Sequence, residues 1–259
     1  IKASRVDEPT PSGTGIVFDG TEGTVYGNVT VQNNFEVKSG ETLTIPDGSS
    51  LSGNFTNEGS IVVKEGGTLN STPTGGTVVY APTISNQPQD VTVTEGATVT
   101  FTVTATGENL SYQWQQSTDS GSDWTNVGSA TSSNTYTIDN TTTSMSGYQY
   151  RCVVSNSAGE VTSDVVTLTV TAKTYGLKAE PSALKFGSVT EGYTAAPAAQ
   201  TVTVTNTGNQ TVTLTQPTSN YYTIGMLSKT VLAPNDTATI TVQPKAALPV
   251  GNKNEVVTV

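Results

Sequence analysis

Threonine alternates with apolar residues in many short runs of this chain, and this alternation constrains its fold most. The clearest run, Thr98-Val-Thr-Phe-Thr-Val-Thr104, places threonine at every second position. Successive side chains of a β-strand point to opposite faces of its sheet, so the run gives one apolar and one hydroxylated face. The 49 Thr residues favour strands and the 25 Gly residues favour turns. The sequence therefore predicts an all-β protein whose sheets bury one face.

The charged and metal-binding residue types exclude several classes of function. The 259-residue chain has no His, one Cys, 11 Lys plus Arg and 21 Asp plus Glu, with a net charge of −10. Without His, the usual protease base and most zinc sites are missing, and clustered basic residues for a phosphate backbone are also lacking. No stretch reaches the roughly 18 to 20 apolar residues that span a bilayer. We predict no cofactor, no nucleic-acid partner, no membrane insertion and a monomer, and expect any export signal or anchor to lie outside this sequence.

Three segments differ in periodicity, and we predict one domain for each: residues 1–80, 81–171 and 172–259. Charge is unevenly divided among them, because residues 81–171 carry one basic and eight acidic side chains. The linkers are short, Tyr80-Ala-Pro82 and Thr171-Ala-Lys-Thr174. Joints of this kind restrict swivelling more than Gly/Ser tethers do.

The first segment has brief apolar patterns after regularly spaced glycines. These glycines are Gly40, Gly48, Gly53, Gly59, Gly66 and Gly75. The strands they separate are too short for an ordinary hairpin sandwich, so residues 1–80 are predicted to form a β-solenoid-like or irregular β-domain. The passage that begins Gly40-Glu-Thr-Leu-Thr-Ile-Pro resembles short β-helical stretches of bacterial surface proteins. The alternative is a compact antiparallel β-domain.

The second segment shows several alternating runs at intervals of about ten residues, which indicates two packed sheets. Its Trp114 and the motif Gly147-Tyr-Gln-Tyr-Arg-Cys-Val-Val-Ser-Asn-Ser-Ala-Gly159 resemble the immunoglobulin-like domains found in tandem in bacterial secreted proteins. The resemblance implies a core that contains Val103, Trp114 and Cys152. Because Val103 stands where the disulfide partner of that fold usually lies, it also implies that no bridge forms.

A second implication of the same resemblance concerns Tyr150, two residues before Cys152. In this fold, that position holds the tyrosine corner, whose hydroxyl bonds a backbone group upstream. The resemblance therefore places Tyr150 in the core and its hydroxyl on the backbone of residues 139–144.

The third segment predicts another sandwich from its alternating Val/Thr and Ile/Thr runs. The passages Phe186-Gly-Ser-Val, Val204-Thr-Asn-Thr-Gly and Leu232-Ala-Pro-Asn-Asp resemble immunoglobulin-like modules of the Hydin and major-sperm-protein type, common in bacterial surface proteins. We expect the last strand of this domain to include Thr258 and Val259.

Few residues suggest chemistry. Cys152 lacks a His partner, and the strand pattern points it inward, so we predict an inert buried thiol. The acids of the first segment flank turns, as solvated loop charges do, and we predict no catalytic residue and no enzyme activity; they are Glu36, Glu41, Asp47, Glu58 and Glu65. Asp119 and Asp123 lie in a loop that lacks an alternating calcium-ligand motif, so we predict no metal site.

Aromatic side chains are the remaining candidates for ligand binding, because exposed rings stack on the faces of sugars. We considered Trp124, Tyr148, Tyr221 and Tyr222. The immunoglobulin resemblance assigns Trp114 and Tyr150 to the core. We select Trp124, Tyr221 and Tyr222 as ligand-binding candidates.

Taken with the resemblances, the sequence predicts a non-catalytic stalk or adhesion module of a bacterial surface or secreted protein. Its partner would be a glycan or a host or cell-surface protein, and its location extracellular. One alternative is an accessory region, carbohydrate-binding or spacer, of a secreted polysaccharide-degrading enzyme. A second is a structural component of an extracellular or phage assembly.

Overall fold

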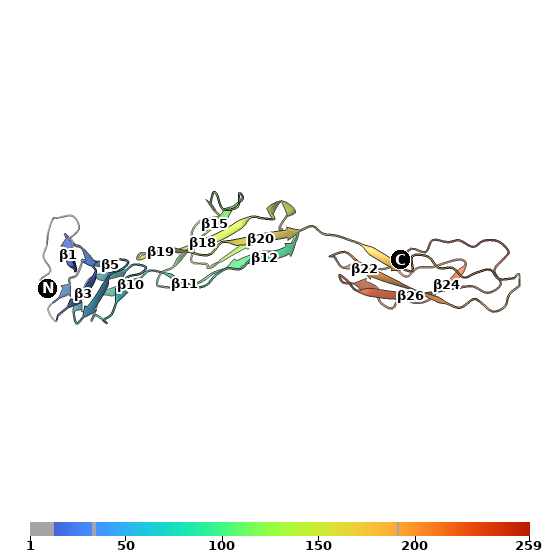
Figure 1. Cartoon of the computed structure of the whole chain (residues 1–259), viewed down its shortest axis with the longest axis horizontal. Coiled ribbons are helices and arrows are strands. Elements are labelled where there is room, and N and C mark those ends of the chain that lie inside the picture. Colours follow the sequence, from blue (N-terminus) through green and yellow to red (C-terminus); the bar gives the residue numbers. More distant parts are fainter. Residues whose placement is uncertain (1–12, 33–34, 191) are drawn as a thin grey trace. The chain divides into compact units, whose positions relative to one another are not determined.

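The computed structural model describes residues 13–32, 35–190 and 192–259, and nearly all of its regular structure is β (Figure 1). The described helical structure is one short turn, η1 (Thr143–Met145). The prediction of an all-β chain is confirmed. The chain divides into two compact units, Ile1–Thr171 and Ala172–Val259, which are described separately below. No helix in the described ranges is long and apolar enough to cross a membrane.

Three sheets make up the N-terminal region. The first contains β1 (Gly15–Asp19), β2 (Glu22–Tyr26), β5 (Thr42–Ile45), β8 (Ser60–Val63) and β10 (Thr77–Tyr80). The second contains β3 (Asn28–Val31), β6 (Ser50–Gly53) and β9 (Thr68–Leu69), and the third β4 (Glu36–Val37) and β7 (Thr56–Asn57). From β2 to β7 the chain visits the three sheets in turn, twice over, and β8, β9 and β10 then extend the first two sheets.

Most strand pairs of this region are parallel, which the antiparallel alternative does not explain. Only the β1–β2 pair among its described pairings is antiparallel. Equivalent apolar residues of successive strands stand side by side, as Leu43, Ile61 and Val78 do in the first sheet. Leu43 and Ile61 are fully buried, so each strand adds an inward residue to one continuous core.

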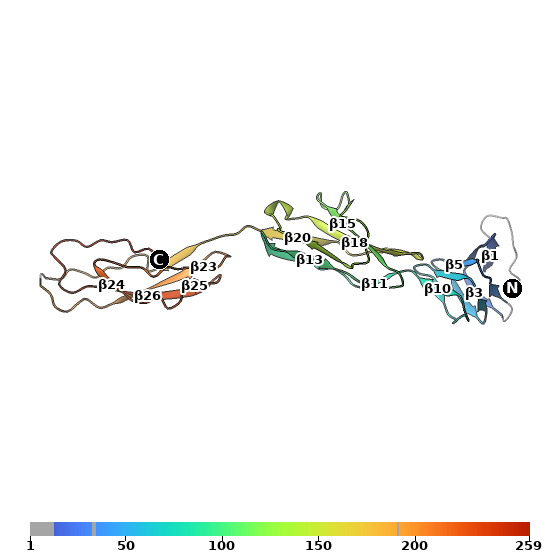
Figure 2. The ribbon, with the colours of Figure 1, turned by 180° about the vertical axis from the view of Figure 1, so that it is seen from behind.

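Residues 83–171 form one six-stranded sheet and two two-stranded sheets around a shared core. The larger has the order β12 (Val91–Thr94), β20 (Val166–Thr171), β18 (Gln149–Asn156), β15 (Ser111–Ser117) and β16 (Thr125–Asn126), with β19 (Gly159–Thr162) also on β18. The two smaller sheets pair β11 (Thr83–Asn86) with β14 (Thr104–Thr106), and β13 (Val99–Thr102) with β17 (Thr135–Ile138). Strands β11 and β13 are labelled in Figure 2. Strand β12 runs parallel to β20, and the other pairs are antiparallel.

Aromatic residues dominate the core between these sheets. Val103, Trp114, Tyr150 and Cys152 are buried in one cluster, and Trp114 stands directly opposite Cys152 in the β15–β18 register. Phe101 stacks on Tyr150 with 4.9 Å between ring centroids. Thus alternate residues of β13, β15 and β18 reach the same core, as the threonine pattern requires.

The expected backbone bond of Tyr150 is not formed. Within the described residues its hydroxyl donates no hydrogen bond to residues 139–144, and this implication of the resemblance is wrong here. The ring is held instead by Phe101 and by Tyr136, whose centroid is 5.8 Å away. Burial, with smaller effects of Tyr136 and Tyr148, raises the pKa of Tyr150 to about 12.

The second unit also has two sheets. One has the order β21 (Leu177–Glu180), β22 (Gln200–Asn206), β26 (Thr237–Pro244) and β24 (Tyr222–Ile224), and the other pairs β23 (Val212–Thr213) with β25 (Val231–Leu232). Strands β23 and β25 are labelled in Figure 2. The core is aliphatic, with Val204, Leu232 and Ile240 buried. The expected strand at Thr258 and Val259 is absent, since β26 is the last described strand; Val259 nevertheless packs on the core.

Candidate functional site

A row of polar side chains crosses the outer face of the larger sheet in residues 83–171. Trp114 and Cys152 point inward, so their neighbours Gln115 and Arg151 point outward. The register places Gln115 opposite Arg151 on one side and opposite Asn126 on the other. We call Asn126, Gln115 and Arg151, together with Trp124, the Arg151 row.

Hydrogen bonds and a ring contact connect the row. Arg151 Nε donates to Gln115 Oε1 at 2.8 Å, and Gln115 Nε2 donates to Asn126 Oδ1 at 2.9 Å. The guanidinium carbon of Arg151 lies 4.2 Å from the ring centroid of Trp124, a cation–π contact. The row is therefore a fixed array and not a set of independently moving side chains.

The loop of residues 117–124 holds Trp124 in place. Trp124 Nε1 donates to the carbonyl of Gly121 at 3.1 Å, and Gly121 N donates to Ser117 Oγ at 2.9 Å. Gly121 has a φ of +89°, a left-handed conformation that favours glycine. Trp124 is partly buried, so part of its ring surface stays open to solvent.

In the same loop, the Asp119 carboxylate accepts hydrogen bonds from the loop itself. The Asp119 carboxylate accepts from Asp123 N at 3.0 and 3.1 Å and from Ser117 Oγ at 2.6 Å. The Asp123 amide, followed by the Ser117 hydroxyl, lowers the pKa of Asp119. No group of three or more His, Cys, Asp or Glu residues that could hold a metal occurs in the described part of the chain.

Cys152 lies on the inner side of β18. It is fully buried and free, and burial raises the pKa of its thiol to about 12. A nucleophilic cysteine needs a lowered pKa and access to solvent. Neither condition holds here.

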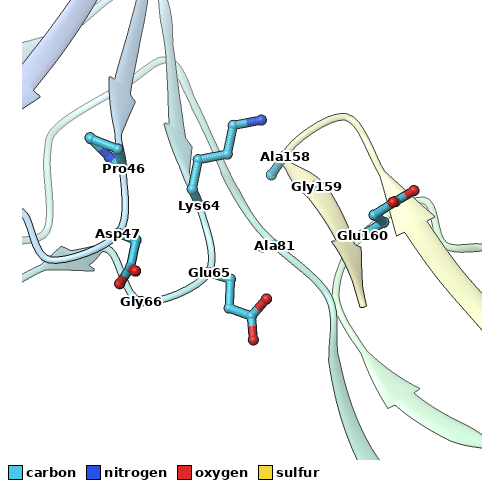
Figure 3. A pocket seen from close by; sticks show the side chains of 9 residues that line it. All are labelled: Pro46, Asp47, Lys64, Glu65, Gly66, Ala81, Ala158, Gly159 and Glu160. Carbon is cyan, nitrogen blue, oxygen red and sulfur yellow. The ribbon is translucent and has the colours of Figure 1, made fainter. Parts of the chain in front are cut away.

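Acidic residues gather at a cleft of about 670 Å³ within the first unit (Figure 3). Asp47 and Glu65 come from the N-terminal region, and Glu160 comes from β19. Figure 3 shows Lys64 reaching toward Ala158, whereas the three carboxylates do not converge on one point.

The chain joins the N-terminal region to β11 beside this cleft. Tyr80 ends β10 opposite Val63, and Ala81 N donates to the Val63 carbonyl at 2.8 Å. From the other side, Asn156 Nδ2 donates to the carbonyls of Tyr80 at 2.8 Å and Glu108 at 3.2 Å. The linker is thus bonded to both neighbours, and we call these contacts the Asn156 joint.

The turn after β18 completes the joint. Asn156 Oδ1 accepts from the backbone amides of Ala158 at 2.9 Å and Gly159 at 3.2 Å. Ala158 is fully buried, and a side chain built on Gly159 would come 3.6 Å from Ala81. One amide side chain therefore shapes the turn and holds the linker against it.

Tyr221 and Tyr222 belong to the second unit and differ in environment. Tyr221 is 36% exposed, and Lys253 Nζ lies 5.5 Å from its ring centroid. Tyr222 is partly buried and donates from its hydroxyl to the Lys253 carbonyl at 2.6 Å. Its ring packs near Phe186 at an apolar cleft of about 420 Å³. Tyr221 presents the more accessible ring.

Sequence patterns did not identify Arg151, Gln115, Asn126 or Asn156 as site residues. A signal existed for Arg151, because the charge count leaves residues 81–171 with a single basic side chain. Gln115 and Asn126 become candidates only when the strand register is known. The role of Asn156 depends on a contact with Tyr80, 76 residues away in sequence, which no local pattern reveals.

One family model and one curated relative match parts of the chain. Residues 80–172 match the family model described as Domain of unknown function (DUF8696). "Endoglucanase C" of Cellulomonas fimi is 42% identical over 94 residues, which cover 36% of this chain and 8% of the endoglucanase. The chain thus spans a small part of that relative.

Solved structures with similar regions include several immunoglobulin domains. Titin domains z1z2 in complex with telethonin are 19% identical with a TM-score of 0.32, covering 65% of this chain and 83% of that chain. Titin domain M7 is 33% identical with a TM-score of 0.28, covering 35% and 94%. Sidekick-1 immunoglobulin domains 1-5 are 21% identical with a TM-score of 0.30, covering 39% and 24%. The chain is thus similar in part to immunoglobulin domains, and 94 of its residues are similar to part of an endoglucanase.

Proposed function

We propose that this chain is a non-catalytic region of a modular, extracellular bacterial protein, in which it holds a binding surface at a fixed orientation. The observation that carries this proposal is the Asn156 joint. A spacer transmits orientation only when its linkers are held, and this linker is bonded on both sides. The low charge content, 12% of residues, and the threonines on the outer faces of the strands suit sheets that bury one face and expose the other to solvent.

We further propose a domain for each segment: a short β-solenoid over residues 1–80, an immunoglobulin-like sandwich over 81–171 and a sandwich of the Hydin and major-sperm-protein type over 172–259. Parallel pairing in three sheets supports the first. The sandwich of the Hydin and major-sperm-protein type is supported by the four-stranded and two-stranded sheets of the second unit. The passages of residues 186–189, 204–208 and 232–236 that resemble that family support it too. Each domain has its own cluster of buried apolar residues.

Distance measurements between spin labels test the joint. The labels replace exposed serines on either side of it, in Ser39→Cys and Ser129→Cys; Cys152 is buried and stays unlabelled. We expect a narrow distance distribution in the otherwise unchanged chain and a broader one after Asn156→Ala, because that change removes the bonds to Tyr80 and Glu108. Asn126→Ala is the matched control and should leave the distribution narrow. A broad distribution in the unchanged chain would contradict a fixed joint.

The endoglucanase match favours one other candidate, an accessory region of a secreted polysaccharide-degrading enzyme. In both cases the region itself is non-catalytic, and the difference lies in what it is attached to. Sequencing the complete gene separates them. A glycoside-hydrolase domain in the same reading frame would support the accessory region, whereas a wall or membrane anchor without such a domain would support the stalk.

A further inference from the structure

We propose that the Arg151 row is a binding site for a glycan that carries carboxylate groups, such as a uronic-acid oligosaccharide, with Arg151 as the residue that contacts the carboxylate. This names the ligand class of the surface that the proposed function presents. The two rest on different contacts, because Asn156 forms the joint and Arg151 forms the site.

Within the described ranges of the chain, Arg151 belongs to neither of the ion pairs that the structure records. It is the single basic residue of residues 81–171, which also contain eight acidic residues. The ion pairs Lys178 with Glu180 and Lys229 with Asp236 lie in the second unit. An arginine that serves folding alone would be expected to pair with one of the abundant carboxylates. The charge of Arg151 therefore remains available to a ligand.

The guanidinium of Arg151 is also oriented, before any ligand binds, by contacts within the protein. Its Nε–H is bonded to Gln115 and its carbon lies over Trp124, while its Nη groups have no hydrogen-bond partner in the described residues. Arginine binds carboxylates through two parallel N–H···O bonds. A flexible side chain loses conformational entropy when it adopts this geometry. Fixing the side chain before binding reduces that cost.

Neighbouring side chains suit the hydroxyl groups of a sugar. On β15 and β18 the outward residues flanking the row are Gln113, Gln149 and Val153. Gln113 Nε2 bonds the carbonyls of Trp114 and Gly128, which leaves its amide oxygen free to accept. Planar amides pair with adjacent sugar hydroxyls, and the open part of the Trp124 ring offers an apolar surface to a sugar face.

The charge of the surroundings favours a glycan over an acidic protein. Residues 81–171 have seven more acidic than basic side chains, so an acidic protein surface would be repelled across a broad contact. A glycan strand contacts a narrower area. It can place one carboxylate on Arg151 while its hydroxyls meet the amides of the row.

Calorimetric titration of the full chain with tetragalacturonic acid tests the site, and the carboxyl-reduced, neutral tetrasaccharide is the comparison ligand. We expect the acidic ligand to bind at least about tenfold more tightly than the neutral one, as a charge-assisted hydrogen bond typically provides. Arg151→Gln should abolish this preference, and Arg151→Lys should retain only part of it, because an ammonium cannot form the bidentate pair.

Controls separate charge from folding. Lys64→Gln removes one positive charge of the same unit at the cleft near the joint and should leave the affinity unchanged. Trp124→Ala should weaken binding while unfolding cooperatively, as judged by near-ultraviolet circular dichroism. Equal binding of the acidic and neutral ligands, an unchanged affinity in Arg151→Gln, or binding only of a peptide carboxylate would overturn the proposal. A fixed joint in the spin-label experiment would stand in each of these cases.

Discussion

Strand β18 presents two different environments on its two sides. Tyr150 and Cys152 face inward, are almost fully buried and have pKa values raised to about 12 by burial. Arg151, between them, faces outward, is in neither recorded ion pair of the described chain and belongs to a connected polar row. Residues adjacent in sequence thus have opposite roles, because the pleat of a strand reverses the side chain at each step.

The outer face of the β13–β17 sheet is also solvated, but it differs from the outer face that carries the Arg151 row. There, Thr100 and Thr137 bond each other through their hydroxyls at 3.1 Å, and Thr98 donates to Asp139 at 3.0 Å. These threonines satisfy one another across the strands. The Arg151 row instead ends in donors that the protein does not use. The two solvated surfaces therefore differ in whether their hydrogen-bonding groups find partners among the described residues.

Truncation of an inward residue should give the largest effect. Phe101 is 1% exposed and stacks on Tyr150. Phe101→Ala should lower the free energy of unfolding by about 3–5 kcal/mol, since both apolar burial and packing are lost. The neighbouring outward substitution Thr100→Ala should cost less than about 1 kcal/mol. Urea unfolding followed by tryptophan fluorescence measures both, and similar losses would show that the two faces are not distinct.

A second test uses the position that lacks a disulfide partner. Val103 and Cys152 lie in the same core cluster, and a bridge forms when the two Cα atoms are within about 7 Å. Val103→Cys should form a bridge with Cys152 under oxidising conditions and raise stability by about 2–4 kcal/mol over the reduced form. Adding Cys152→Ala to the variant should remove the gain. A free thiol count of two after oxidation would mean that Val103 does not align with the disulfide position.

Sequence alone could predict which residues of a strand face the core and which face solvent. It could not predict the function of either face. Alternation indicated which residues of each strand share a face, because burial of a face leaves a periodic signal in the residue types, and the family resemblance implied that Val103, Trp114 and Cys152 share one core. The all-β class followed from the same signal. The backbone bond of Tyr150 was inferred from the family and is absent, since rings from Phe101 and Tyr136 hold the side chain in its place.

The functional contacts were harder to predict because they join residues distant in sequence. Arg151 and Gln115 are 36 residues apart and become neighbours only through the β15–β18 register. Trp124 was selected for its ring, yet its place beneath a guanidinium depends on how the loop of residues 117–124 closes. The last strand was expected at Thr258 from its alternating valines; the structure leaves residues 245–259 without one, because alternation indicates a possible strand but not a pairing partner.

Alkaline pH should destabilise the inner face specifically. The thiol pKa of Cys152 rises from 9.0 to about 12 and the hydroxyl pKa of Tyr150 from 10.0 to about 12, so the folded state holds protons that the unfolded chain releases. Stability is therefore complete below pH 9 and falls as the pH rises toward 12, by up to about 1.4 kcal/mol per pH unit for each group. In urea titrations, Cys152→Ala should remove the fall between pH 9 and 10 and keep the later fall due to Tyr150. A stability that is flat from pH 8 to 11 would contradict the burial of both groups.

The smallest expected effect is on the outer face and is the most informative about function. Arg151 is held by one hydrogen bond and one ring contact at a solvated surface, and such contacts contribute about 1 kcal/mol or less. Arg151→Gln should accordingly change the free energy of unfolding by less than about 1 kcal/mol, far below the effect of Phe101→Ala. A larger loss would mean that the row serves the stability of the sandwich, and its unpaired charge would then be a by-product of folding. A small loss, together with a lost preference for the acidic oligosaccharide, would show that β18 uses its inner side for stability and its outer side for recognition.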